Sequence, residues 1–100
     1  MPQRKPLSPE AVASALRSLS EWSIVEGKLV REYRFPDFSR AFAFMAGAAT
    51  VAEKLDHHPE WTNVYGRVSV TLWTHTEGAV TEMDVELASR MEAIAGGLLR

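Results

Sequence analysis

Residues 68–75 read Val-Ser-Val-Thr-Leu-Trp-Thr-His, a stretch in which apolar and polar side chains mostly alternate. Successive side chains of a strand point to opposite faces, so the alternation divides these residues into two sets. One set contains Val68, Val70, Leu72 and Thr74, and the other contains Ser69, Thr71, Trp73 and His75. The pattern predicts a strand with one face in the core. We expect His75 to leave the sheet on the more polar face or at its rim.

This strand has a predicted partner just before it in the chain. Residues 63–65 precede a turn near Gly66, and together with residues 68–75 they predict an antiparallel hairpin. A second hairpin is predicted upstream, because residues 21–25 and 28–35 alternate around Glu26-Gly27. The chain therefore contains four expected strands, grouped in antiparallel pairs.

Three helices are expected around these hairpins. Ser8-Pro9-Glu10 has the composition of a helix start, and the first helix should end near Leu19. Pro36-Asp37 supplies a cap for a second helix from about 38 to 56 or 57. Thr81, with an acid three residues later, opens a third helix that reaches the C-terminus.

The order of elements is helix, hairpin, helix, hairpin, helix. It predicts one α+β domain over residues 1–100, in which a four-stranded antiparallel sheet has helices packed on one face. Residues 1–7 are expected to form a flexible tail.

The second and third helices both carry apolar stripes that predict core packing. The stripe of the second helix is the wider. Its members are Phe38, Phe42, Met45, Ala49 and Ala52, with Phe44, Val51 and Leu55 on a neighbouring line. The stripe of the third helix consists of Leu87, Met91, Ile94 and Leu98.

Composition restricts the class of protein further. The chain has 100 residues, of which 46% are hydrophobic and 24% charged, as is typical of a soluble globular domain. It lacks cysteine, which excludes disulfides, thiol catalysis and thiolate metal sites. We expect a cytoplasmic protein without a membrane span, since no apolar run is long enough and no signal segment begins the chain. The net charge of −2 and the scattered basic residues give no sign of direct nucleic-acid binding.

All three histidines fall within two short stretches of the sequence. His57 and His58 are adjacent, and His75 ends the strand described above. Histidine changes charge near neutral pH, so clustered imidazoles can exchange protons with a substrate. Alternatively, exposed histidines simply end a helix, where a cation interacts well with the helix dipole. Pro59 favours an extended His58 and should end the second helix by about His57.

Acidic residues near the histidines are candidates for supporting roles. Glu53 lies one helical turn before His57 and could orient its ring, while Asp84 could support the site, cap the third helix or do both. Glu53, His57, His75 and Asp84 also provide donors suited to zinc or non-haem iron. The familiar His-Glu-x-x-His spacing is absent and no Ser or Thr is marked as a nucleophile, so we expect metal-free acid-base chemistry.

The sequence resembles the pterin-4a-carbinolamine dehydratases over roughly residues 20 to 90. The similarity is carried by Ala52-Glu53-Lys54, His57-His58-Pro59-Glu60-Trp61, Asn63-Val64-Tyr65, Thr74-His75, Gly78, Thr81 and Asp84. Residues 31–38 and 43–45, together with Trp22, also look like this family. The double histidine, the later Thr-His and the still later Asp make the signature specific.

The resemblance implies an activity and roles for individual residues. The implied reaction is loss of water from 4a-hydroxytetrahydropterin to give quinonoid dihydropterin, with no cofactor and no metal. His57 and His75 would exchange protons at the 4a-hydroxyl, while His58 would contact the pterin and help to remove the ring proton. Trp61 and Trp22 offer flat surfaces suited to the pterin, although half-buried tryptophans are often packing residues.

The resemblance also implies partners. We expect a homodimer or homotetramer and a functional link to a pterin-dependent aromatic amino-acid hydroxylase, such as a phenylalanine hydroxylase. The main alternative is a non-catalytic binding or dimerisation module on the same fold, acting as a transcriptional coactivator or an assembly factor.

Overall fold

The computed structural model describes residues 2–99, which form three helices and four strands. In chain order they are α1 (Pro9–Ser18), β1 (Ser23–Val25), β2 (Lys28–Arg34), α2 (Phe38–Leu55), β3 (Glu60–Val64), β4 (Arg67–Leu72) and α3 (Glu82–Ala95). The order confirms the predicted α-β-β-α-β-β-α arrangement and the α+β class.

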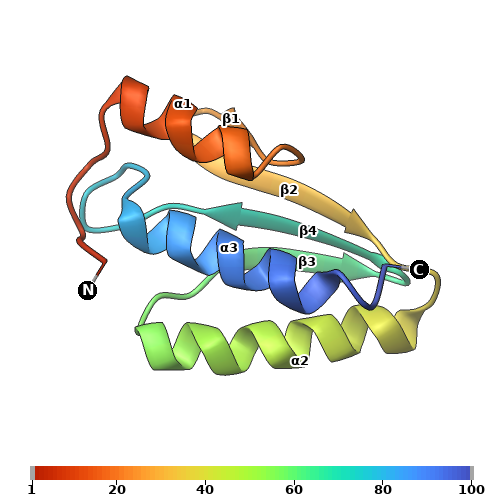
Figure 1. Ribbon diagram of the computed structural model, residues 1–100. Coiled ribbons are helices and arrows are strands. Elements are labelled where there is room, and N and C mark those ends of the chain that lie inside the picture. Colours follow the sequence, from red (N-terminus) through yellow and green to blue (C-terminus); the bar gives the residue numbers. More distant parts are fainter. Residues whose placement is uncertain (1, 100) are drawn as a thin grey trace.

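The four strands form one antiparallel sheet in the order β1-β2-β4-β3. The centre of the sheet is the long pairing of β2 with β4, in which Leu29 is opposite Leu72 and Tyr33 opposite Val68. All three helices lie on one face of this sheet (Figure 1). The two hairpins are therefore joined side by side through their second strands.

Each hairpin turn contains a glycine that its surroundings require. Glu26 and Gly27 have φ values of 52° and 76°, as a two-residue turn matching the twist of the strands requires. In the second turn, a Cβ on Gly66 would lie 2.4 Å from the Phe35 carbonyl oxygen. Gly66 is needed there because the end of β2 passes so close, and the Phe35 N–H donates to the Gly66 carbonyl at 2.8 Å.

The core lies between the sheet and the helices. The predicted alternation of residues 68–75 is confirmed, because Val68, Val70, Leu72 and Thr74 are all buried. Tyr33 and Phe44 are the largest fully buried side chains, and their rings pack at a centroid distance of 4.6 Å. β2 and α2 thus meet through aromatic contact.

The prediction for the core face of α2 was wrong in part. The buried residues of this helix are Ala41, Phe44, Ala48 and Ala52. Phe38 and Phe42 are 54% and 59% exposed and contact each other instead. A face with three alanines allows the helix to approach its neighbours closely. With that face toward the core, Phe38 and Phe42 lie on the side of the helix that faces outward.

The third helix follows its predicted stripe more closely, but it ends at Ala95 and does not reach the C-terminus as predicted. Leu87 and Met91 are fully buried, and Ile94 and Leu98 pack against the core while partly exposed. Thr81 caps the helix as predicted, and its side chain accepts a hydrogen bond from the Met83 N–H.

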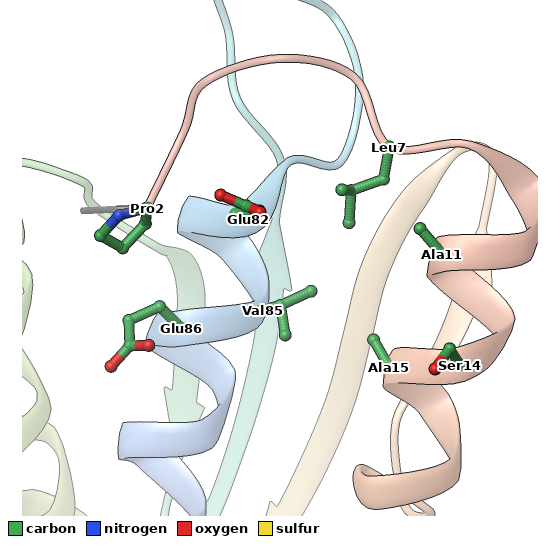
Figure 2. Close-up of a pocket in the computed structure, with 8 residues that line it drawn as sticks. All are labelled: Pro2, Leu7, Ala11, Ser14, Ala15, Glu82, Val85 and Glu86. Atoms are coloured by element: carbon green, nitrogen blue, oxygen red, sulfur yellow. The ribbon is translucent and has the colours of Figure 1, made fainter.

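The segment predicted as a tail contacts the body of the domain at several points. The N–H of Leu7 donates to the Val80 carbonyl, and that of Gln3 donates to the Glu82 carboxylate. These bonds lead the segment across the beginning of α3 (Figure 2). Between residues 2 and 99, no helix combines the length and apolar character that crossing a membrane requires.

Candidate active site

The histidines gather at one end of the sheet. The end of α2, the segment after β4 and the beginning of α3 meet there, away from the β3–β4 turn (Figure 1). A cavity of about 240 Å³ opens among them. It is lined by Arg4, Asp56, His57, His58, Trp73, Thr74, His75 and Thr76. The structure therefore brings all three predicted histidines to one pocket.

The end of α2 determines how His57 and His58 are presented. Asp56 ends the helix in a left-handed conformation, with φ 51° and ψ 45°. The N–H of His57 then turns back to the Ala52 carbonyl at 3.1 Å. Because the chain reverses here and Pro59 keeps His58 extended, the two imidazoles have different surroundings.

His57 is buried and paired with a buried carboxylate. Its Nε2 lies 2.5 Å from Oδ1 of Asp84, and the exposed fractions of the two side chains are 8% and 0%. A carboxylate only accepts hydrogen bonds, so Nε2 is the nitrogen that carries the proton. This pairing fixes the ring and leaves Nδ1 as the nitrogen that can gain or lose a proton.

The other oxygen of Asp84 is held by a chain of hydroxyls. Oδ2 accepts the Thr81 N–H at 2.8 Å and the Thr74 hydroxyl at 3.0 Å. Since Thr74 gives its only proton to Asp84, Thr81 is the donor in the 2.7 Å bond between the two hydroxyls. Asp84 both caps α3 and orients His57, as the sequence had allowed.

His58 is exposed and pairs with Glu53. Its Nε2 lies 2.7 Å from Oε1 of Glu53, and the side chains are 56% and 78% exposed. The expected contact of Glu53 with His57 was wrong, because the reversal at Asp56 directs His57 toward α3 and leaves His58 beside Glu53. An exposed pair of this kind adds little stability, and its effect is to orient the ring.

His75 is exposed and stacks on Trp73. The ring centroids are 4.1 Å apart and the planes differ by 18°. The ammonium group of Lys28 lies over the Trp73 ring at 4.1 Å from its centroid. The three histidines are thus held in three ways: by a buried carboxylate, by an exposed carboxylate and by an aromatic ring.

The other aromatic candidates lie outside the lining of this cavity. Trp22 is buried, and its Nε1 donates to the Glu92 carboxylate at 3.0 Å. Trp61 is partly buried and packs against the core from β3, opposite Val70. Pro59, also partly buried, joins His58 to β3. Contact of either tryptophan with a pterin stays a prediction.

Trp73 and Arg4 line the pocket and were not among the sequence candidates. Trp73 could have been found, because strand parity places it on the same face as His75. Arg4 could not, because its Nη2 reaches the carbonyls of Leu55 and Asp56 from more than fifty positions away. The bond to Asp56 is 2.5 Å long, and Arg4 is one of the residues that line the pocket.

A larger hollow, of about 580 Å³, lies between α1 and α3 (Figure 2). Leu7, Ala11, Ala15 and Val85 supply most of its apolar wall, and Glu82 and Glu86 stand on its α3 side. No histidine lines it. The smaller cavity is the better candidate because all three histidines line it.

The candidate metal ligands are not gathered around one point. Asp84 is bonded to His57, whereas Glu53 is bonded to His58. Within residues 2–99, no three His, Asp or Glu side chains are arranged to hold a metal ion.

The fold and the pocket together define a small α+β domain with an imidazole-carboxylate site at one end of its sheet. A sequence model of the family described as pterin 4 alpha carbinolamine dehydratase matches residues 5–94. This match covers most of the chain, which therefore belongs to that family.

Individual relatives agree with this assignment. Proteins of Brucella ovis and Brucella canis, both provisionally named pterin-4-alpha-carbinolamine dehydratase, are 54% identical over 95 residues. Each alignment covers 93% of this chain and 98% of the relative. A crystal structure described as a transcriptional coactivator/pterin dehydratase from Brucella melitensis is 52% identical, with a TM-score of 0.89. It covers 92% of this chain and 100% of the solved chain.

Proposed function

We propose that this protein dehydrates a 4a-hydroxytetrahydropterin to quinonoid dihydropterin and water by histidine acid-base catalysis. The observation that carries the proposal is the meeting of His57, His58 and His75 at one pocket, with His57 held by the buried Asp84. Membership of the family supports the choice of substrate.

The reaction explains why imidazoles are suited to this pocket. The bond between C4a and the hydroxyl oxygen breaks, and hydroxide is a poor leaving group unless it receives a proton. A proton must also leave a ring nitrogen, so one proton is added and one is removed. Imidazoles serve both steps near neutral pH. No electrons are transferred to or from the substrate, so the step needs no redox cofactor.

The geometry favours a division of roles among the histidines. His57, with its proton on Nε2 and Nδ1 left to react, and the exposed His75 are proposed to act at the 4a-hydroxyl. His58 is proposed to contact the pterin and assist loss of the ring proton, with Glu53 orienting it. Asp84 stabilises the protonated form of His57 when that ring holds a second proton.

Stopped-flow measurement of freshly generated 4a-hydroxytetrahydropterin tests this function. The uncatalysed dehydration supplies the baseline, and added protein is expected to accelerate it in proportion to its concentration. If the rate stays at the baseline with folded protein, the chain is not a dehydratase. The alternative of a non-catalytic coactivator or assembly module would then be preferred, in line with the description of the Brucella melitensis structure.

We also propose that the protein self-associates as a homodimer or homotetramer. Leu87 and Met91 of the α3 stripe are buried in the core of the protomer, so this stripe is not the surface that we propose for association. The larger exposed apolar side chains of α2 are Phe38 and Phe42, at 54% and 59% exposure. Light scattering that finds a monomer at working concentration would refute this expectation.

Cellular context extends the proposal one step further. A dehydratase of this kind would act in the cytoplasm on the carbinolamine left by an aromatic amino-acid hydroxylase, such as a phenylalanine hydroxylase. Direct binding of nucleic acid is not part of the proposal, in keeping with the net charge of −2.

A further inference from the structure

The ring of His75 depends on one neighbour for its orientation. Among residues 2–99, the imidazole forms no side-chain hydrogen bond or ion pair, and its one ring contact is the stack with Trp73. By contrast, His57 and His58 each have a carboxylate partner. A catalytic imidazole that is exposed and has no hydrogen-bonded partner would sample several rotamers unless packing restrained it.

The backbone next to His75 is firmly placed. Thr74 donates its N–H to the Ala79 carbonyl at 2.9 Å and its hydroxyl to Asp84. Its carbonyl accepts the N–H groups of Glu77 and Gly78 at 3.1 and 2.9 Å. The Cα of His75 therefore has little freedom, and the side-chain torsions are what must be fixed.

Trp73 is itself held in place from the neighbouring strand. Leu29 of β2 pairs with Leu72 of β4, so Lys28 lies across from Trp73. The Lys28 ammonium is 4.1 Å from the indole centroid, a cation-π distance. Lys28 is half-buried, and its contact restrains the indole on which His75 stacks.

We propose that Trp73 is a positioning residue that acts through His75, holding the imidazole in the orientation required for proton transfer at the 4a-hydroxyl. The proposal rests on the dehydratase function proposed above. Its rival is direct contact, in which Trp73 stacks on the pterin and contributes to substrate binding. The two differ in which kinetic constant Trp73 controls and in whether its effect needs His75.

A double-mutant cycle distinguishes these roles. Trp73→Leu removes the ring plane and is expected to lower kcat about tenfold with little change in KM, because a misdirected catalytic group costs rate and leaves substrate affinity intact. Trp73→Phe keeps a ring for stacking and should restore most of the rate. In the His75→Ala background, Trp73→Leu should cause no further loss, because the group that it positions is gone.

The same variants give a readout that does not need activity. In wild-type protein the stacked indole should shift the His75 ring-proton NMR signals upfield. Trp73→Leu should move them toward the positions of an unstacked imidazole, and Trp73→Phe should retain part of the shift. Tyr65→Leu is the matched control, because Tyr65 is 84% exposed and lies in the β3–β4 turn, at the opposite end of the sheet (Figure 1). This substitution should leave both kcat and the His75 signals unchanged.

Three outcomes would overturn the proposal. They are unchanged kcat and His75 signals in Trp73→Leu, a rise in KM at constant kcat, and a further tenfold loss in the His75→Ala background. If Trp73→Leu does not fold, Lys28→Met takes its place. It is expected to move the His75 signals and lower kcat by a smaller factor, and an unchanged spectrum and rate would again overturn the proposal. An inactive wild-type protein with an upfield-shifted His75 would refute the dehydratase function and leave the stacking itself established.

Discussion

Two carboxylates of α3, Asp84 and Glu92, each accept hydrogen bonds from three other residues. They differ in the chemistry of the groups that donate to them. They lie eight residues apart, about 12 Å along the helix axis. Asp84 accepts hydrogen bonds from His57, Thr74 and Thr81. Glu92 accepts hydrogen bonds from Trp22, Arg31 and Tyr33. Each gathers polar groups from elements that are distant in the sequence.

The donors account for the difference. The partners of Glu92 keep their protons at neutral pH: Arg31 stays charged, the Trp22 indole does not titrate, and Tyr33 is buried. Burial first, and then the hydrogen bond to Glu92, raises the pKa of Tyr33 above its ordinary value. One partner of Asp84 is an imidazole that lines a cavity. On the proposed function, Asp84 therefore supports proton transfer because one of its donors is an imidazole, whereas none of the donors of Glu92 is an imidazole.

The largest expected effect follows removal of that imidazole. His57→Ala should lower kcat for dehydration by roughly 10²–10⁴-fold, the range for a positioned acid or base. It also leaves Oδ1 of Asp84 without a donor, so unfolding should be easier by about 1–3 kcal/mol. Stopped-flow rates and urea unfolding measure the two effects. A variant that is folded and turns over at the wild-type rate would remove His57 from the mechanism.

The next effect separates the two carboxylates directly. Asp84→Asn keeps the shape of the side chain and removes its charge, so it no longer stabilises a protonated His57. We expect kcat to fall on the order of 10²-fold, the lower end of the range for a positioned acid or base, because the His57 imidazole itself is retained. The matched control is Glu86→Gln, because Glu86 lies on the same helix in an exposed pair with Arg90. This variant should keep kcat within about twofold of wild type. Equal rates for the two variants would contradict the role given to Asp84.

The corresponding change at the second carboxylate should act on stability alone. Glu92→Gln weakens charge-assisted bonds to Arg31, whose side chain is 11% exposed. Unfolding free energy is expected to fall by about 1.5–3 kcal/mol. The rate of dehydration should stay unchanged below the melting transition, and Glu86→Gln again serves as the control. A loss of activity in folded Glu92→Gln protein would show that the two networks are coupled.

The smallest effect is a dependence of stability on alkaline pH. Because the pKa of Tyr33 is raised in the folded protein, the unfolded chain loses this proton first, near pH 10. The neutral Tyr33 therefore contributes stability below that pH, and the contribution falls as pH rises, by up to about 1.4 kcal/mol per pH unit. Urea unfolding from pH 9 to 11 should show this loss in wild-type protein and not in Tyr33→Phe. Parallel curves for the two proteins would contradict it.

Local patterns in the sequence predicted the elements of the fold well. The Glu26-Gly27 turn, the alternation of residues 68–75 and the Thr81 cap all depend on near neighbours in the chain. The face of α2 was harder to predict, since Phe38 and Phe42 are as apolar as the buried Phe44. Periodicity shows that a helix has an apolar side, while the choice of the residues that meet the sheet depends on how closely the helix packs.

By itself, the sequence determined the order of helices and strands, the cluster of histidines and the family to which the chain belongs. Only the tertiary structure decided that His57 pairs with Asp84 while His58 takes Glu53, that Arg4 reaches the pocket and that Trp73 supports His75. The physical reason is that helix caps, turns and strand parity are set by residues a few positions apart. Partners 27 or 52 positions apart are chosen by the directions in which the folded elements present their side chains.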